Sequence, residues 1–387
     1  MERAIYAATV ICSILFVVVG NRIVTGGFAF FDPGVPGPVA ARVESILSHR
    51  HTDADAQSTV PEETLRIAFT AVIEDGPRKG ETVRAAQVSD SFTPTEIREV
   101  EAGDRVLLYE VEEVDETDEK SGDRWVLQEF VRTRPLAVLG VIFVACLLLF
   151  GRAKGVSTVI SLAFTCLAVF GIFIPSVLSG SNIYVTSSLV CIFTIVMTLL
   201  LVNGPNVKSL AACLGCIGGV AVTGLLVLAS DHWLGLTGLV DEQSVFLLYI
   251  NPESPVSLKA VIFSSIIIGA MGATLDVAVS IASSLSEIRA ATHEPTFAGL
   301  FKSGMNIGRD IMGTMANTLV LAYIGSSTSL VLLLLVNSAS FTDMINREII
   351  VVEILRALVG STGLLFTIPL TSLLSAYVYT RGKKTPQ

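Results

Sequence analysis

Charged side chains are scarce in this sequence. Asp, Glu, Lys and Arg make up 16% of its 387 residues, whereas 51% of the residues are hydrophobic. A soluble domain usually has about a quarter of its residues charged. The composition therefore excludes a wholly soluble protein. It predicts an α-helical polytopic protein of the cell membrane, most of which lies in the lipid bilayer.

Acidic residues outnumber basic ones in the segment 34–133, which holds most of the charged residues of the chain. Residues 34–133 hold 22 acidic residues and 11 basic ones, a net charge of −11, whereas the whole chain has a net charge of −9. Nucleic-acid binding needs a basic surface, so we expect no nucleic-acid partner. The segment 34–133 is thus soluble and acidic, and it interrupts an otherwise apolar chain.

The motifs of common catalytic sites are also missing. The chain has four histidines, and it contains no HExxH motif, no phosphate-binding loop and no recognisable Ser/His/Asp set. Cys213-x-x-Cys216 lies in a lipid-length apolar run without a second ligand pair nearby, so we interpret both as small residues at a helix contact. We therefore expect no enzyme, catalytic residue, cofactor or metal site.

Eight apolar runs can each cross a bilayer core, which takes about 20 residues of helix. They cover residues 4–20, 134–151, 155–178, 183–202, 207–230, 258–286, 310–336 and 349–379. We expect an N-terminal transmembrane anchor in 1–33, an inserted domain in 34–133 and a seven-helix membrane domain in 134–387. The alternative for the first run is a cleaved signal peptide. We favour an uncleaved anchor, because no convincing cleavage site follows the run.

The distribution of Lys and Arg orients these helices, because basic residues concentrate in cytoplasmic loops. With the N-terminus inside, the inner flanks carry Arg3, Arg152, Lys154, Lys208, Arg289, Lys302, Arg309, Arg381, Lys383 and Lys384. The short outer loops carry Lys259 and Arg347. This asymmetry predicts cytoplasmic N- and C-termini and an extracytoplasmic domain at residues 34–133.

Alternating apolar residues predict that the outer domain is rich in β-strands. The expected strands cover 39–47, 64–74, 82–90, 105–114 and 124–132. The segment 75–80, with two glycines and a proline, is a strong hairpin turn between the second and third strands. Five short strands in a domain of this size are typical of a small OB-like barrel.

Asp276 is the strongest candidate for a functional residue, because ionisable side chains inside membrane helices are costly and usually mark a function or a buried pair. Gly272 and Ser280 lie one turn before and after it on the same helix face. Such a small, polar stripe should face protein or water rather than lipid. Burial favours the neutral acid, so Asp276 could bind and release protons, or hold Na⁺. The alternative is a protonated Asp276 that only hydrogen-bonds a neighbouring helix.

Depth along the helices predicts the neighbours of Asp276. It lies about 15 Å from an inner helix end at Ser286. If the next helix starts near Asp310, three polar residues on one of its faces lie about 6 to 12 Å deep. These candidates for ion coupling or translocation are Thr314, Asn317 and Thr318.

Arg356 enters the membrane from the outer side, about 10 Å deep. Asp276 lies about 24 Å from the outer edge if its helix starts near Ala260, so we expect no direct bridge between Asp276 and Arg356. Glu353 precedes it by three residues on the same helix, and this spacing predicts a structural intramembrane pair, Glu353–Arg356.

Three stretches resemble the YibE/F-like family of bacterial membrane proteins. They are GAMGATLDVAVSIASSLSE (269–287), GRDIMGTMANTLVLAYIG (308–325) and EILRALVGSTGLLFTIPLT (353–371). The single anchor, the outer β domain and the later helices match in the same order, so the resemblance covers nearly the whole chain. It implies a protein of the membrane.

A weaker likeness links the last three helices to SecD/SecF-type proton-driven exporters. It rests on Gly272-x-x-x-Asp276 and on the Ser286-Glu-Ile-Arg289 that follows. In those exporters an acidic residue of this helix takes part in proton flow, and the likeness implies such a role for Asp276. This chain departs from them by placing five apolar segments, rather than three, between its outer domain and the end of the Asp276 helix.

These patterns together predict an ion-coupled secondary transporter, with the proton as the expected ion, or an export component. Its expected partners are the lipid bilayer, a small-molecule or ion substrate, and a second copy or another membrane protein. The alternative is a non-transporting membrane scaffold or sensor, whose outer domain binds envelope material or a partner protein.

Overall fold

The computed structural model describes residues 2–25, 37–52, 64–89, 98–110, 124–240, 242–249 and 255–381. The chain forms two compact units. One comprises Met1–Phe30 with Cys146–Gln387, and the other comprises Phe31–Ala145. The first is a bundle of apolar helices. The second contains a β barrel and extends into the first turns of the following helix, beyond the boundary expected at residue 133.

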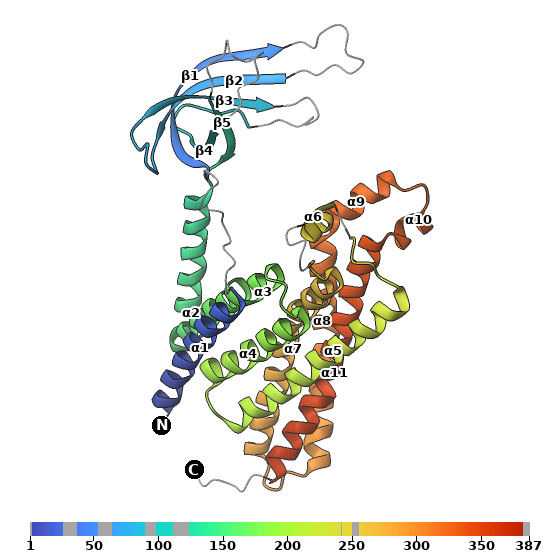
Figure 1. The fold of residues 1–387 in the computed structure, drawn as a ribbon. Helices are drawn as coiled ribbons and strands as arrows, with labels where there is room; N and C mark the ends of the chain where they lie inside the picture. The colour runs from blue at the N-terminus through green and yellow to red at the C-terminus, as the bar shows by residue number, and fades with distance from the viewer. Residues whose placement is uncertain are drawn as a thin grey trace. The chain divides into compact units, whose positions relative to one another are not determined.

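The barrel is a closed sheet of five strands in the order β1-β2-β3-β5-β4, with β4 pairing back onto β1 (Figure 1). The strands are β1 (Val39–Thr52), β2 (Thr64–Ile73), β3 (Thr82–Ser89), β4 (Arg105–Glu110) and β5 (Trp125–Phe130). The β3–β5 pair is parallel and the other pairs are antiparallel. All five predicted strands are present. β5 is shorter than predicted, and residues 111–114 of the predicted fourth strand lie outside the described residues.

Strand β1 continues past its predicted end at Leu47 to Thr52. Its register shifts between Val43 and Ser45 and again between Ile46 and Ser48. Such irregularities bend a strand, and they let β1 curve so that it pairs with β2 along its length and with β4 near its start. The polar end of β1, which the alternating pattern did not reach, is held by this pairing.

The interior of the barrel follows the alternation of apolar residues. Ile67, Phe69 and Ile73 of β2 are almost completely buried, as is Leu108 of β4. Gln87 is a buried polar exception. Its side chain donates to the Arg98 carbonyl and accepts from the Val100 N–H, both at 2.9 Å. It thereby holds the segment before β4 against β3.

The rest of the described chain is helical. Its elements are α1 (Glu2–Val24), α2 (Thr133–Ala168), the π-helix η1 (Val169–Phe173), α3 (Ile174–Leu178), α4 (Ile183–Asn203), α5 (Val207–Leu234), α6 (Glu242–Tyr249), α7 (Leu258–Ala291), α8 (Phe297–Ser326), α9 (Thr328–Asn337), α10 (Phe341–Asn346) and α11 (Glu348–Arg381). Six described helices are long and apolar enough to cross a membrane, or seven if the bent pair α8–α9 is one span. These helices fit a membrane protein.

One of the six spans is a helix of 46 residues, Thr133–Leu178, where the sequence predicts two helices. Its backbone leaves the helical conformation at Arg152, where φ is 49° and ψ is −127°. Close by, a Cβ atom on Gly155 would overlap the carbonyl oxygen of Leu147, so the turn requires a glycine there. The break lies between the two predicted helices, 134–151 and 155–178.

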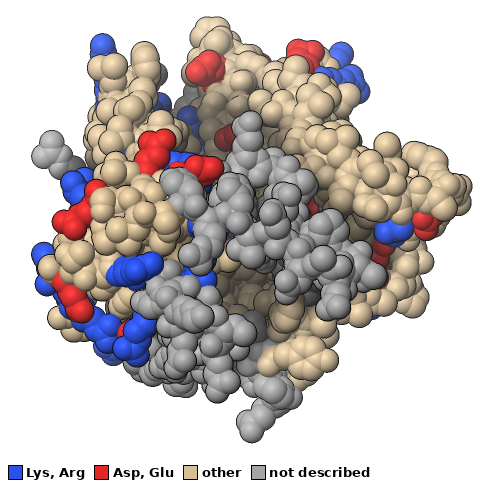
Figure 2. Space-filling view, turned by 90° about the horizontal axis from the view of Figure 1, so that it is seen from above, with Lys and Arg blue, Asp and Glu red and all other residues tan. Residues whose placement is uncertain are grey.

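The surfaces of most helices are apolar. Phe150 of α2, Leu225 of α5 and Phe366 of α11 are examples of large apolar side chains that are exposed. Where the face drawn in Figure 2 shows described residues, charged side chains are scattered among uncharged ones. Exposed apolar area of this extent suits a lipid environment.

Helix α11 is central in the bundle and packs against α5, α7 and α8. Its contact with α5 depends on glycines, because a Cβ atom on any of three glycines would overlap a threonine hydroxyl of the facing helix. The pairs are Gly215–Thr371, Gly219–Thr367 and Thr223–Gly363. These positions recur every four residues on both helices and bring the two backbones together, as in other small-residue contacts between membrane helices.

Helix α8 begins at Phe297, so the predicted start near Asp310 is wrong. The hydroxyl of Thr296 caps it by accepting from the Gly299 N–H at 3.2 Å. Gly304 then packs against Ser372 of α11. The first turns of α8 are therefore anchored in the bundle, and Asp310 lies inside the helix rather than at its N-terminus.

Candidate functional site

The candidate residues of α7 lie on its exposed face. Gly272, Asp276 and Ser280 are exposed, whereas Val277 and Ala278 beside them are buried in the bundle. No large apolar side chain of α7 is exposed. Each of the other helices that are long and apolar enough to cross a membrane has exposed large apolar side chains. The apolar residues of α7 thus pack inside the unit, and its small and polar residues point outward.

Helix α8 lies beside α7 and runs in the opposite direction. Two contacts set their relative positions: a Cβ atom on Gly269 would lie 2.8 Å from the Tyr323 hydroxyl, and one on Gly304 would lie 3.0 Å from Leu285 Cδ1. Asp276 is therefore about level with Thr314. The earlier start of α8 explains why depth counted from Asp310 placed Thr314 too near the helix end.

The polar residues of α8 do not close a ring around Asp276. Thr314, Asn317 and Thr318 are all exposed. Thr314 donates its hydroxyl hydrogen to the Ile311 carbonyl at 2.9 Å, and Thr318 donates to the Thr314 carbonyl at 2.8 Å. Among the described residues, the side chains of Asp276 and Asn317 make no hydrogen bond or ion pair. The structure thus gives the Asp276 carboxyl no counter-charge.

A second polar group surrounds the predicted pair on α11. Arg356 Nη1 donates to Glu353 Oε1 at 2.5 Å, as the spacing predicts. Arg356 Nη2 also donates to Ser265 Oγ of α7 at 3.3 Å. Ser327 Oγ donates to the other carboxylate oxygen of Glu353 at 2.7 Å. The pair therefore links α11 to α7 and to the junction of α8 and α9.

Ser327 lies where the chain changes direction by 57° between α8 and α9. The Ser327 N–H still donates to the Tyr323 carbonyl, and the Ser327 carbonyl accepts from the Val331 N–H. The backbone is thus bent but remains hydrogen-bonded. The hydroxyls of Ser326 and Thr328 each donate a hydrogen bond to a backbone carbonyl one turn earlier in the helix. This arrangement often accompanies bends in helices.

Tyr323 completes this group from α8. Its hydroxyl is buried without a hydrogen-bond partner among the described residues, as is Nε of Arg356. A Cβ atom on Gly360 would lie 3.6 Å from the same hydroxyl, which also lies next to Gly269. The ring of Tyr323 therefore fits between α7 and α11 because both helices have a glycine at its tip.

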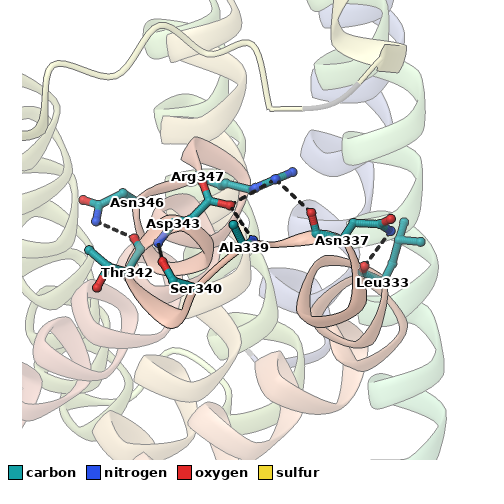
Figure 3. A network of polar contacts seen from close by, with 8 residues as sticks. All are labelled: Leu333, Asn337, Ala339, Ser340, Thr342, Asp343, Asn346 and Arg347. Carbon is teal, nitrogen blue, oxygen red and sulfur yellow. Dashed lines mark hydrogen bonds and ion pairs between the residues drawn. The ribbon is translucent and has the colours of Figure 1, made fainter.

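The short α10 fixes the connection from α9 to α11 (Figure 3). Ser340 Oγ accepts from the Asp343 N–H at 3.1 Å, and Asp343 Oδ2 accepts from the Ala339 N–H at 3.3 Å. Arg347 donates to Asp343 Oδ2 and to the Asn337 carbonyl, both at 3.4 Å. This network joins the last turn of α9 to the residue before α11, so the bent pair is held at both ends.

The two cysteines of the CxxC pattern lie on α5, as the sequence predicts. Cys216 is buried and contacts the Thr274 hydroxyl of α7 at 3.4 Å, and Cys213 is half-buried. Among the described residues, no group of three or more His, Cys, Asp or Glu side chains is placed to hold a metal ion. Cys216 thus lies in the contact between α5 and α7, and Cys213 packs at the edge of the same core.

Sequence reasoning found Glu353 and Arg356 but missed Ser265, Ser327 and Tyr323. The pair is local in sequence, whereas its partners come from two other helices. The Ser326-Ser327-Thr328 run was an available signal of a bend in an apolar helix. Nothing in the sequence indicates which turn of α11 faces that bend.

Comparison with known proteins gives one match. The family model described as "YibE/F-like protein" matches residues 139–381, which include all the candidate residues. No curated protein and no solved structure matches the chain. The weaker likeness to SecD/SecF-type exporters finds no support in these comparisons.

Proposed function

We propose that this chain, which belongs to the YibE/F-like family, is an ion-coupled secondary transporter or export component of the cell membrane. The proposed coupling ion is the proton, and the proposed coupling residue is Asp276. One observation carries the proposal: a carboxyl group lies on a polar stripe of a membrane-length helix, and no described Lys or Arg pairs with it to keep it ionised. Such a group can gain and lose a proton as its access to water changes.

The contrast with Glu353 supports this assignment. Glu353 is also an acid in a membrane-length helix, but it has a cation at 2.5 Å and a hydroxyl donor at 2.7 Å. These partners satisfy its carboxylate and tie it to the bend at Ser327. Glu353 and Arg356 therefore serve as a structural pair, and Asp276, with Thr314 at its level, is left as the group whose charge can change.

Eight membrane crossings are the proposed topology. The break at Arg152 supports two crossings within Thr133–Leu178, because a straight helix of that length would be about 69 Å long, more than twice the bilayer core. Arg152 and Lys154 at the break supply basic residues for a cytoplasmic turn. An even number of crossings would put both termini on the same side, and the distribution of Lys and Arg favours the cytoplasm for them and the outside for the barrel.

Retention of α1 as an uncleaved anchor is part of the same proposal. Asn21 Nδ2 donates to the Gly171 carbonyl in the π-helix η1 at 2.5 Å. Phe16 stacks on Phe193 of α4 with ring centroids 4.1 Å apart. A π-helix leaves backbone carbonyls without their usual partner, and Asn21 satisfies one of them. Removal of α1 would expose these contacts.

We propose that the barrel handles a substrate or a partner outside the membrane. Its closed strand order and its parallel β3–β5 pair support an OB-like barrel. Barrels of that type bind ligands on the face of the second and third strands and in the loops beside it. The acidic character of the domain disfavours polyanionic ligands.

Proton flux into liposomes tests the transport proposal directly. The purified full-length protein is reconstituted around a pH-sensitive dye, and a pH gradient and a membrane potential are imposed. We expect acidification or alkalinisation faster than in protein-free liposomes. Flux equal to that of protein-free liposomes under every gradient would contradict the proposal and favour the scaffold or sensor.

A further inference from the structure

The outward face of α7 is unusual for a helix of its length. Its exposed residues are Lys259, Gly269, Gly272, Asp276, Ser280, Glu287, Ala290 and Ala291. A helix face in contact with lipid is normally apolar, and an uncompensated carboxyl in contact with lipid is costly. This face of α7 therefore cannot be the lipid-facing side of the folded protein.

Helix α8 extends the same surface. Thr314, Asn317, Thr318 and Gly313 are exposed, and no atom outside the helix backbone lies within 4 Å of a Cβ placed on Gly313. Gly272 has the same open space. We call the surface formed by Gly272, Asp276, Ser280, Gly313, Thr314, Asn317 and Thr318 the α7/α8 polar face. No described residue of the helical unit covers it.

The chain's own α5–α11 contact shows what such a surface can do. There, glycines and hydroxyl residues recur every four positions (215, 219 and 223 against 363, 367 and 371) and let two helices meet closely. On α7 the residues 272, 276 and 280 have the same spacing and the same small size. The α7/α8 polar face therefore has the composition of a helix–helix contact without its second helix.

We infer that a second copy of this chain covers the α7/α8 polar face, so that the proposed ion-coupling site lies between two copies. The face carries both halves of a hydrogen-bonded contact, because the carboxyl of Asp276 can accept and the amide of Asn317 can donate, and neither has a partner among the described residues. A surface that contains both is complementary to itself, as a two-fold symmetric interface requires. One copy alone leaves Asp276 exposed on a membrane-length helix, so the proposed site is incomplete without the second.

Cysteine crosslinking in native membranes tests the inference. The exposed cysteines Cys12, Cys146 and Cys166 are replaced by serine, and Ser280→Cys is introduced on the polar face. We expect oxidation to give a disulfide-linked product of twice the chain's mass. Leu225→Cys, at an exposed apolar position of α5, is the matched control and should give at least tenfold less.

A glycine variant tests whether the contact needs this face. Gly272→Leu has open space within the chain, so a loss of crosslinking reports on the second copy rather than on misfolding. Added to Ser280→Cys, it should lower the crosslinked fraction at least tenfold. Gly140→Leu, the same change at another glycine with open space, should leave it unchanged.

Three results would overturn the inference. The first is that Ser280→Cys gives no crosslinked dimer, and the second is that Leu225→Cys gives as much dimer as Ser280→Cys. The third is a crosslinked product of a different mass, which would assign the face to another protein. Because crosslinking is measured without any transport, failure of the dimer and failure of proton coupling are distinguishable.

Discussion

The carboxylate of Glu353 accepts a hydrogen bond from Ser327 Oγ at 2.7 Å, at the residue where α8 gives way to α9. The same carboxylate holds Arg356. A single acid therefore neutralises a half-buried guanidinium and fixes the position of a bent helix pair.

Replacing this acid should destabilise the bundle. Glu353→Gln leaves Arg356 without a counter-charge, and we expect a loss of about 2–3 kcal/mol, below the value for a fully buried pair because both side chains are partly exposed. Ser327→Ala removes one hydrogen bond and should cost about 1 kcal/mol. Thermal unfolding in mild detergent measures both. Equal, negligible effects would mean that the pair does not hold the bend.

The α5–α11 contact should fail when one glycine gains a methyl group. Gly219→Ala would force its Cβ into the Thr367 hydroxyl, and we expect a loss of about 1–3 kcal/mol. Thr367→Ala removes that hydroxyl, so the double variant should regain part of the stability. Gly313→Ala, which has open space, is the control and should have no such cost. A double variant as unstable as the sum of the two single variants would contradict the contact.

Much of this fold could be predicted from the sequence, because helices and strands leave local patterns. Apolar runs located the long helices, and alternation located all five strands. The break at Arg152 agrees with the short polar gap between two runs. The start of α8 at Phe297 was missed, because the apolar run begins only near residue 310 and the packing of Gly304 and Gly308 against α11 leaves no local pattern in the sequence.

The candidate site was only partly predictable. The stripe of Gly272, Asp276 and Ser280 follows from helical spacing alone. Its exposure does not, because the side of a helix that packs inside the bundle depends on helices distant in sequence. For the same reason the sequence placed Thr314, Asn317 and Thr318 around Asp276, whereas both threonine hydroxyls bond to their own helix.

Reporter fusions can test the proposed membrane topology. Fusions after Lys154, Lys208, Lys302 and Gln387 should report a cytoplasmic location, and fusions near Lys120 and Gln243 an external one. The reason is the excess of Lys and Arg on the proposed inner side. An external signal at Lys154 would remove the crossing pair that meets at Arg152. A cytoplasmic signal at Lys120 would reverse the whole orientation.

The barrel should fold without the membrane helices. Residues 34–133 expressed alone should be soluble, monomeric and β-rich by circular dichroism, because the barrel closes on its own core. Gln87→Leu should destabilise it by about 2–3 kcal/mol, since the buried Val100 N–H and the partly buried Arg98 carbonyl lose their partner. Thr70→Ala, at an exposed hydroxyl contact on β2, should change stability by less than about 0.5 kcal/mol. An aggregated product would show that the barrel needs the rest of the chain.

The most direct measurement of the central claim is proton flux through Asp276→Asn in liposomes. Asparagine keeps the volume and the polarity of the side chain but cannot gain or lose a proton, so flux should fall to the level of protein-free liposomes while the melting temperature stays unchanged. Asp231→Asn is the matched control, because that acid pairs with Lys259 at 3.2 Å, and its flux should equal that of the unmodified protein. Undiminished flux in Asp276→Asn would contradict the account.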